Sequence, residues 1–93
     1  MARSFTGTEL DLLAANRCPK GFPADLVQRA RRKLLMVQSA AELADLRAPP
    51  GNRLEDLSGD RAGQWSIRIN DQWRICFRWT AGSASALEVT DYH

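Results

Sequence analysis

Residues that bind metals or form disulfides are scarce in this chain. Among its 93 residues there are one histidine and two cysteines. Cys18 lies beside Pro19 in a predicted turn, whereas Cys76 lies within a predicted strand, so we expect two free thiols in a reducing compartment. A single histidine without paired cysteines provides no zinc ligand set, and the sequence therefore predicts neither a metal nor another cofactor.

Long apolar runs and a large charge excess are also missing. No run approaches the length that spans a membrane, and the first residues lack the hydrophobic region of a signal peptide. We therefore expect a soluble cytoplasmic protein without membrane contact, formed by one small domain over residues 1–93. The formal net charge of +2 is well below that of a chain that binds nucleic acid through total charge alone.

The distribution of charge is more informative than its sum. Every cation after Lys33 is an arginine. Between residues 61 and 79 there are four arginines and one acidic residue, Asp71, which predicts a positive local field. The four are Arg61, Arg68, Arg74 and Arg78.

Two runs in which apolar and polar residues alternate, 65–69 and 73–79, predict a β-hairpin. The loop between them needs an odd number of residues, because a one-residue slip would turn every side chain of one strand to the opposite face. A three-residue loop over Asn70–Gln72 meets this condition and supplies turn-forming residues.

This register predicts that Arg68 lies opposite Arg74 and Ile67 opposite Ile75. Like charges in such a pair disfavour the hairpin by some tenths of a kcal/mol up to about 1 kcal/mol. Two interpretations are open. The arginines spread into water, or they await an anion such as phosphate, to which the arginine fork is suited.

The N-terminal half of the chain predicts helices. Met1–Phe5 is too short to distinguish a first strand from coil. Thr6–Glu9 matches a capping box and opens a short helix that extends to about Asn16. A second helix begins near Pro23, and apolar residues at helical spacing predict its buried side. They are Leu26, Ala30, Leu34 and Val37.

The other side of the second helix is basic. It has Arg29, Arg31, Arg32 and Lys33 within five consecutive residues. Three interpretations remain open for these cations: a solvated outer face, a surface for an RNA backbone, and a surface for an acidic segment of a partner.

The remaining elements complete the predicted fold. Ser39–Glu42 matches a second capping box and opens a third helix through Leu46. Arg53–Leu57 is predicted as a strand, Thr80–Ser85 as a loop of small residues, and Leu87–Tyr92 as the final strand. Helices followed by strands with short connections predict an α+β fold in which helices pack on one face of an antiparallel sheet.

Because the apolar rows meet the helices, the opposite face of the sheet is predicted to be polar and exposed. Its members are Ser66, Arg68, Arg74, Cys76, Arg78 and, if the last strand pairs in the same sense, Tyr92.

An acid, a phenol and an imidazole follow one another at Asp91, Tyr92 and His93. They are either a frayed terminus or part of a site that cleaves a phosphodiester without a metal. In such a site a base removes the 2′-hydroxyl proton, a cation stabilises the charge at phosphorus and an acid protonates the leaving oxygen. Arg74 suits the cation role with Arg68 beside it, and Glu55 is a further available proton carrier.

Several motifs, taken together and in order, resemble one protein family. They are Ser4-Phe5, Pro50-Gly51-Asn52-Arg53-Leu54, Gly59-Asp60-Arg61, Gly63-Gln64-Trp65-Ser66-Ile67-Arg68, Trp73–Trp79 and Asp91-Tyr92-His93. The combination resembles the HigB-like branch of the RelE toxin superfamily, the toxins of bacterial type II toxin–antitoxin pairs. That resemblance implies a microbial-ribonuclease-like α+β fold and ribosome-dependent cleavage of messenger RNA without a metal. It also implies a HigA-like helix-turn-helix antitoxin that binds operator DNA and neutralises the toxin.

The resemblance implies roles for particular residues. Arg74 matches the family's catalytic arginine, and Asp91, Tyr92 and His93 match its functional C-terminal acid, phenol and imidazole. We expect further RNA contacts from Arg61, Arg68, Arg78 and Glu55.

Two positions depart from the family pattern. Ser58 stands where a lysine is common, and Glu55 stands where some members have a histidine. Two hypotheses follow: a weak nuclease that depends on Arg74, or a toxin-like binding module that has lost catalysis and acts with the antitoxin at the operator. A DNA-binding protein in its own right is disfavoured by the low net charge and the lack of a recognition-helix pattern.

Overall fold

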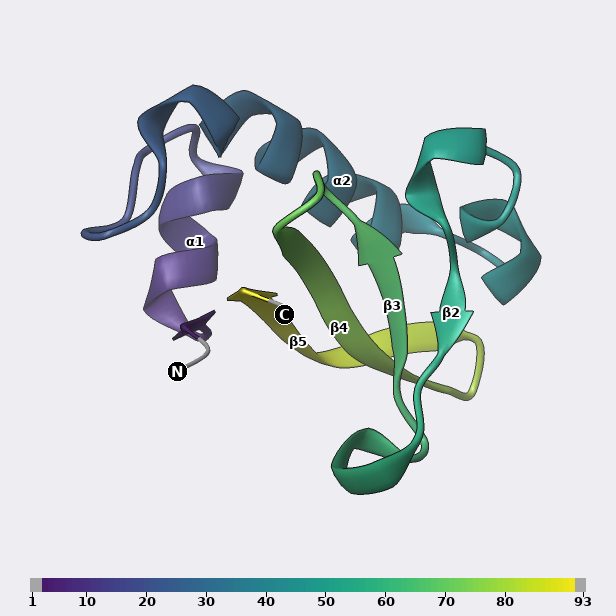
Figure 1. Ribbon diagram of the computed structural model, residues 1–93. Helices are drawn as coiled ribbons and strands as arrows, with labels where there is room; N and C mark the ends of the chain where they lie inside the picture. Colours follow the sequence, from purple (N-terminus) through teal and green to yellow (C-terminus); the bar gives the residue numbers. More distant parts are fainter. Residues whose placement is uncertain (1–2, 92–93) are drawn as a thin grey trace.

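Five strands form one antiparallel sheet in the computed structural model, which describes residues 3–91 (Figure 1). The spatial order of the strands is β1-β5-β4-β3-β2, so β5 pairs with both β1 and β4. Their bounds are β1 Ser4–Phe5, β2 Glu55–Asp56, β3 Trp65–Arg68, β4 Trp73–Thr80 and β5 Ser83–Asp91. With two helices between β1 and β2 in the chain, the predicted α+β class is confirmed.

The β3–β4 hairpin has the predicted register. The N–H of Ile69 donates to the carbonyl of Trp73 at 2.9 Å, and the Asn70 side-chain oxygen accepts from the N–H of Trp73 at 2.7 Å. The loop therefore comprises residues 70–72, because the asparagine side chain fixes the point at which β4 begins. The Cα partners are Ile67 with Ile75 and Arg68 with Arg74.

Helices α1, Thr8–Ala14, and α2, Val27–Ser39, pack against one face of the sheet, as predicted. A 3-10 turn, η1 (Ala24–Leu26), leads into α2. The buried residues of α2 recur at helical spacing and are Val27, Ala30, Leu34 and Val37. Within residues 3–91, no helix has the length and apolarity needed to cross a membrane.

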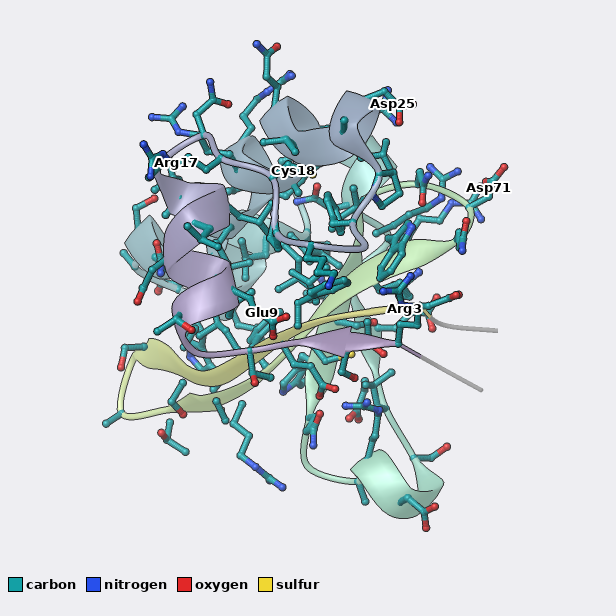
Figure 2. All side chains as sticks on the ribbon, turned by 90° about the vertical axis from the view of Figure 1, so that its left-hand side faces the viewer. Arg3, Glu9, Arg17, Cys18, Asp25 and Asp71 are labelled. Atoms are coloured by element: carbon teal, nitrogen blue, oxygen red, sulfur yellow. The ribbon has the colours of Figure 1, made fainter. Side chains whose placement is uncertain are left out.

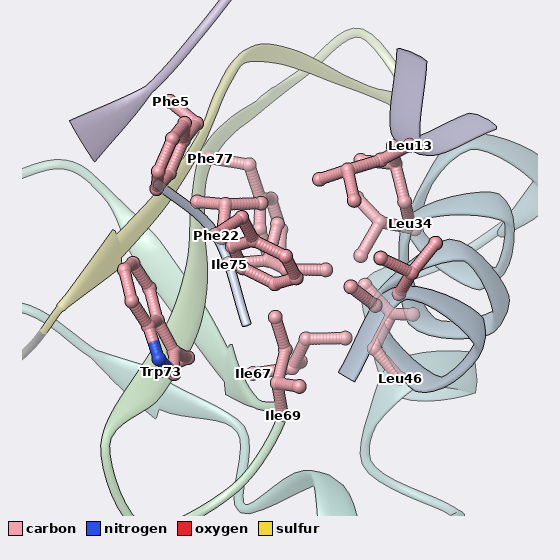
Figure 3. Packing of buried hydrophobic residues seen from close by; sticks show 14 residues of the cluster. Phe5, Leu13, Phe22, Leu34, Leu46, Ile67, Ile69, Trp73, Ile75 and Phe77 are labelled. Carbon is pink, nitrogen blue, oxygen red and sulfur yellow. The ribbon is translucent and has the colours of Figure 1, made fainter. Parts of the chain in front are cut away.

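The core fills the space between these helices and the apolar rows of the sheet (Figure 3). Three aromatic side chains, Phe5, Phe22 and Trp73, meet with ring centroids 5.1 to 5.6 Å apart. Each large apolar side chain that is fully buried contributes about 1.5–3 kcal/mol relative to an exposed one. The fully buried aliphatic members include Leu13, Leu34, Leu46, Ile67 and Ile75.

The predicted capping box at Ser39 is wrong. Ser39 is the last residue of α2, and its hydroxyl donates to the carbonyl of Leu35 at 2.8 Å, a bond that a serine readily makes to the preceding helical turn. The short helix that follows is the 3-10 turn η2, Leu43–Leu46. It is capped by Asp45, whose carboxylate accepts from the N–H of Glu42 at 2.9 Å.

Two predicted boundaries in the C-terminal half are also wrong. Instead of a loop over Thr80–Ser85, β4 and β5 are joined by a tight turn at Ala81 and Gly82, whose φ angles are 52° and 78°. The strand β5 therefore begins before Leu87, and the small residues that indicated a loop lie in a strand with a β-bulge. The bulge is at Ala86, with φ 51°. The predicted strand Arg53–Leu57 contracts to the two residues of β2.

Candidate functional site

Polar side chains form two rows across the face of the sheet opposite the core, and we call this the polar face. The Cα partners of the first row are Ser4, Thr90, Arg74 and Arg68, taken from β1 to β3. Those of the second row are Glu88, Cys76, Ser66 and Glu55, taken from β5 to β2. Since residues of one row lie about 4.5–5.5 Å apart at Cβ, their side chains form continuous polar stripes.

The prediction that this face is open to water is wrong at its centre. Ser66 and Cys76 are fully buried, Thr90 is 1% exposed and Arg74 is 8% exposed. The face is covered by its own long side chains and by the segment that precedes β2, so its polar groups are paired within the protein.

Arg74 is held on the polar face by neighbours that include two hydrogen-bond acceptors and a carboxylate. Its Nε donates to the hydroxyl of Ser66 at 2.8 Å, and its Nη2 donates to the carbonyl of Arg53 at 2.7 Å. The same nitrogen lies 3.5 Å from a carboxylate oxygen of Glu55. Because a planar guanidinium with two fixed donors has little freedom to rotate, the orientation of this cation is set before any ligand arrives.

Backbone geometry before β2 positions two of these groups. The 3-10 turn η3, Pro50–Asn52, ends at Arg53, which has φ 47° and ψ 58°. This left-handed conformation is uncommon for a residue with a side chain, and here it precedes the carbonyl that accepts from Arg74. Two residues later Glu55, about half exposed, pairs with Ser66 across the sheet and so faces the same guanidinium.

Arg61 forms an ion pair, through its guanidinium, with the carboxylate of Glu88. It lies in the 3-10 turn η4, Gly59–Arg61, and donates to both carboxylate oxygens of Glu88, at 2.9 and 3.2 Å. This hydrogen bonding holds the pKa of Glu88 below its ordinary value, and a hydrogen bond from Ser4 acts in the same direction. Beneath this pair, burial raises the pKa of the Cys76 thiol. Glu88 is the Cα partner of Cys76, so the bidentate pair lies beside this cysteine. The RNA contact of Arg61 stays a prediction, in which a phosphate would compete with Glu88 for the guanidinium.

The other predicted arginines lie at opposite ends of the hairpin. Arg68 is half-buried beside Arg74 and forms an ion pair with the exposed carboxylate of Asp71. Arg78 is exposed and lies four residues along β4, about 13 Å from Arg74 at the usual strand rise. Its guanidinium is beside Gly63, where a side chain would meet it at 3.1 Å. The structure thus brings Arg68 and Glu55 to Arg74 but does not bring Arg78 there.

Of the predicted C-terminal residues, Asp91 is described, whereas Tyr92 and His93 lie outside the described residues. Asp91 is the Cα partner of Trp73, so it follows directly after Thr90, the partner of Arg74. Its carboxylate accepts from the side-chain amide of Gln72 at 3.0 Å. The C-terminal end of β5 therefore lies beside the start of β4, where Arg74 is. Alternation nevertheless turns the Asp91 side chain towards the core side of the sheet.

Three partners in this region are missing from the sequence-based prediction. Alternation assigns Ser66 to the polar face without a role, yet its hydroxyl orients Arg74. The predicted pairing of the hairpin strands could have suggested this contact. The carbonyl of Arg53 could not have been found, because it depends on a left-handed residue for which the sequence has no glycine signal. Gln72 is predicted only as a loop residue, although its amide donates to Asp91.

The arrangement suits an oxyanion. The fixed guanidinium of Arg74, with Arg68 beside it, supplies positive charge. The adjacent carboxylate of Glu55 can accept a proton, or it can compete with the oxyanion for the N–H donors of Arg74. Within residues 3–91, a cation and a carboxylate of the kinds that phosphodiester chemistry uses thus lie on one face of the sheet.

Comparison with known proteins connects this geometry to a family. A sequence profile described as "RelE-like toxin of type II toxin-antitoxin system HigB" matches residues 8–93. The chain is similar to "Endoribonuclease HigB" of Proteus vulgaris, with 37% identity over 93 residues and full coverage of both chains. It is also similar to "Toxin HigB-1" of Vibrio cholerae serotype O1, with 44% identity over 63 residues, covering 68% of this chain and 66% of that protein. The chain therefore belongs to the family of RelE-like HigB toxins of type II toxin–antitoxin systems.

Proposed function

We propose that this protein is a toxin that cleaves messenger RNA on the ribosome, with Arg74 as the cation that stabilises the reacting phosphate. The observation that carries the proposal is the fixed guanidinium of Arg74, bound by Ser66 and by the carbonyl of Arg53 on the polar face. The endoribonuclease activity named for the full-length relative supports it. We also propose that the protein acts in the cytoplasm. We propose that residues 1–93 form one domain.

The proposed reaction is a transesterification that needs no metal. The 2′-oxygen of a ribose forms a bond to phosphorus, its proton passes to a base, and the bond from phosphorus to the 5′-oxygen breaks as that oxygen receives a proton from an acid. Arg74 stabilises the additional negative charge on the phosphoryl oxygens, and its fixed orientation reduces the reorganisation needed in the transition state.

The proton carriers are proposed among Asp91, Tyr92, His93 and Glu55. Glu55 lies 3.5 Å from Arg74 on the polar face, whereas Asp91 pairs with Trp73, the residue before Arg74, and follows Thr90 at the end of β5. Tyr92 and His93 follow Asp91 directly in the sequence and are proposed from the family resemblance.

We propose that cleavage depends on the ribosome because the site exposes little positive charge to free RNA. Arg74 is 8% exposed and has an acid at 3.5 Å, so the site attracts free RNA weakly. A ribosome that presents the message in a fixed conformation would supply the missing binding energy. The antitoxin partner is proposed to be a HigA-like helix-turn-helix protein, which would connect the toxin to operator DNA.

A second function is favoured by Ser58. The position that commonly has a lysine in the family is an exposed serine here. A toxin-like module without catalysis would bind the antitoxin and act in operator control, yet leave translation intact.

The experiment is primer extension on a defined message in a reconstituted translation system. Wild-type protein is compared with Arg74→Lys and Arg74→Ala. We expect cuts in phase with stalled ribosomes for the wild type and a loss of at least about a hundredfold for both variants, because lysine cannot reproduce the guanidinium fork.

The matched control is Arg47→Ala, which removes an exposed arginine outside the polar face. Circular dichroism and a denaturation curve for every variant separate loss of chemistry from loss of fold, since Arg74→Ala leaves the buried Ser66 hydroxyl without its partner. Uncut message with folded wild-type protein, combined with intact antitoxin binding, would favour the module without catalysis.

A further inference from the structure

Cations from α2 and from β3 converge beside the loop of the β3–β4 hairpin. Arg29, Arg32 and Lys33 are three and four residues apart, so they share one side of α2. The Nη1 of Arg29 lies 3.5 Å from the carbonyl of Ile69, directly after β3. This contact places the basic side of α2 against the end of the strand that has Arg68.

Lys33 is at the centre of this group. Its ammonium donates to the side-chain oxygen of Asn52, a fully buried residue that also donates to the carbonyl of Leu46 at 3.0 Å. Burial lowers the pKa of Lys33, and the charges of three arginines lower it further. They are Arg29, Arg32 and Arg68. The cations therefore repel one another, and an anion bound among them would relieve that repulsion.

Not every cation of α2 belongs to this group. Arg31 is turned the other way, and its Nε donates to the carbonyl of Ala14 at the end of α1 at 3.0 Å. The basic residues that the sequence places together are thus divided by the fold between a contact with α1 and a cluster at the hairpin. We call the cluster of Arg29, Arg32, Lys33 and Arg68 the cationic shoulder.

We propose that the cationic shoulder binds the phosphodiester backbone of single-stranded RNA next to the nucleotide that is cleaved. The inference rests on the proposed function and adds a second contact to it. Arg68, the member from β3, is the Cα partner of Arg74, so the positive surface continues from the candidate site to the helix. Lys33 is connected to the same site through Asn52, which precedes the Arg53 carbonyl that accepts from Arg74.

An RNA backbone suits this surface better than an acidic peptide does. Phosphates repeat along a strand, and the shoulder presents several cations in succession from α2 to the hairpin. The guanidinium forks of three arginines match phosphate geometry. An acidic protein segment is the competing occupant, and the experiment distinguishes the two.

The test measures direct binding to a fluorescent oligoribonucleotide with 2′-O-methyl groups, which cannot be cleaved because it has no free 2′-hydroxyl. Arg32→Gln removes an exposed cation of the shoulder, and Lys33→Gln removes the central one. The matched control is Arg17→Gln, an exposed arginine that Figure 2 shows far from Asp71, the ion-pair partner of Arg68.

We expect the Kd to rise about three- to tenfold for each shoulder variant at low salt, while Arg17→Gln stays within about twofold of the wild type. The dependence of log K on log salt should become shallower by about 0.7 for each phosphate that a variant no longer binds. Thermal denaturation of each variant verifies the fold. If Lys33→Gln disturbs the structure around Asn52, Arg32→Gln still tests the proposal.

Three outcomes would overturn the proposal: equal effects of all three variants, no binding by the wild type, or tighter binding of a polyglutamate peptide than of RNA. Failure of the proposed function would look different. Ribosome-bound message would then remain uncut by the wild type, while the shoulder variants would still weaken binding of the uncleavable RNA.

Discussion

At the scale of single residues, the candidate site is defined by the hydrogen bonds of Arg74. Its partners include two neutral oxygens, from Ser66 and Arg53, and the carboxylate of Glu55 at 3.5 Å. The neutral partners orient the cation without cancelling its charge. Glu55 is about half exposed and so forms a screened ion pair, with which the phosphate of the proposed substrate would compete.

Replacement of Glu55 by glutamine should strengthen RNA binding. Glu55→Gln removes the anion that competes for Arg74. A solvent-screened ion pair is worth about 0.2–1 kcal/mol, so the Kd for an uncleavable RNA should fall about 1.5- to fivefold. Fluorescence anisotropy measures this change. Asp56→Asn is the control, because it removes the neighbouring exposed carboxylate of β2. Weaker binding by Glu55→Gln would mean that the carboxylate itself contacts the RNA.

Introduction of the family's lysine at position 58 should accelerate cleavage. Ser58 is exposed and follows β2, which has Glu55. Ser58→Lys adds a cation near the reacting phosphate, and a tenfold increase in rate corresponds to about 1.4 kcal/mol of transition-state stabilisation. Single-turnover cleavage on programmed ribosomes measures the rate. An unchanged rate would show that Arg74 and its neighbours already supply the available charge stabilisation.

Glu88 should make the stability of the protein depend on pH. The hydrogen bond from Arg61 lowers the pKa of Glu88 in the folded state, so its contribution to stability is present above its ordinary value of 4.5 and is lost as the pH falls through the lower folded value. In Glu88→Gln, the free energy of unfolding should decrease less between about pH 5 and pH 3. Urea denaturation at several pH values tests this. Asp60→Asn, which removes an exposed carboxylate, should keep the acid dependence of the wild type.

At the scale of elements, the two hairpins differ in how much local sequence reveals. The β3–β4 register follows from side-chain parity, because a slip would turn Arg68 or Arg74 into the apolar core and Ile67 out of it. The β4–β5 hairpin has a weaker signal, since only Gly82 marks its turn. The preceding turn residue, Ala81 with φ 52°, and the bulge residue Ala86 lack the glycine or asparagine that usually marks these conformations. Pairing with β4 and β1 overrides the local preference.

The same distinction applies to the candidate site. Arg74 and its pairing with Arg68 could be predicted from alternation and family resemblance. The burial of Arg74 could not be predicted, because it depends on the path of residues 50–53. There a tight turn places the Arg53 carbonyl within hydrogen-bond distance of Arg74. The charge of Arg61 alone predicts an RNA contact, whereas its bidentate pair with Glu88 depends on a tertiary contact between distant segments.

The turn at Ala81 is therefore a place where the protein can be stabilised. Alanine in the left-handed conformation is strained, so Ala81→Asn should raise the free energy of unfolding by roughly 0.5–1 kcal/mol. Urea denaturation at neutral pH measures the gain. Ala44→Gly in η2 is the opposite control and should lower stability, because glycine has more conformational freedom in the unfolded chain.

At the scale of the whole molecule, the sheet separates an apolar layer from a polar one. The core and both helices lie on one side, and the paired polar rows lie on the other. Cys76 is fully buried within the polar layer, and Cys18 is exposed on the connection between α1 and η1. Both are free thiols, as predicted, so they report on two different parts of the molecule.

Reaction with a thiol reagent should therefore have two phases. Cys18 should react at once, whereas Cys76 should react at least about a hundredfold more slowly, because its burial and its raised pKa leave little accessible thiolate. Absorbance after addition of an aromatic disulfide measures both phases. In Cys18→Ser only the slow phase should remain, and two fast thiols in the wild type would show that the polar layer opens readily.

Asp91 and Arg3 are joined by a backbone hydrogen bond of 2.8 Å, which has a practical consequence for fusion proteins. Any peptide attached before Arg3 or after Asp91 departs from one corner of the sheet, and that corner is shared with Thr90, the partner of Arg74. An affinity tag at either end would then start near the proposed RNA-binding surface. The turn at Ala81 lies at the other end of β4, about 23 Å away at the usual strand rise, and is the better position for a dye or an epitope.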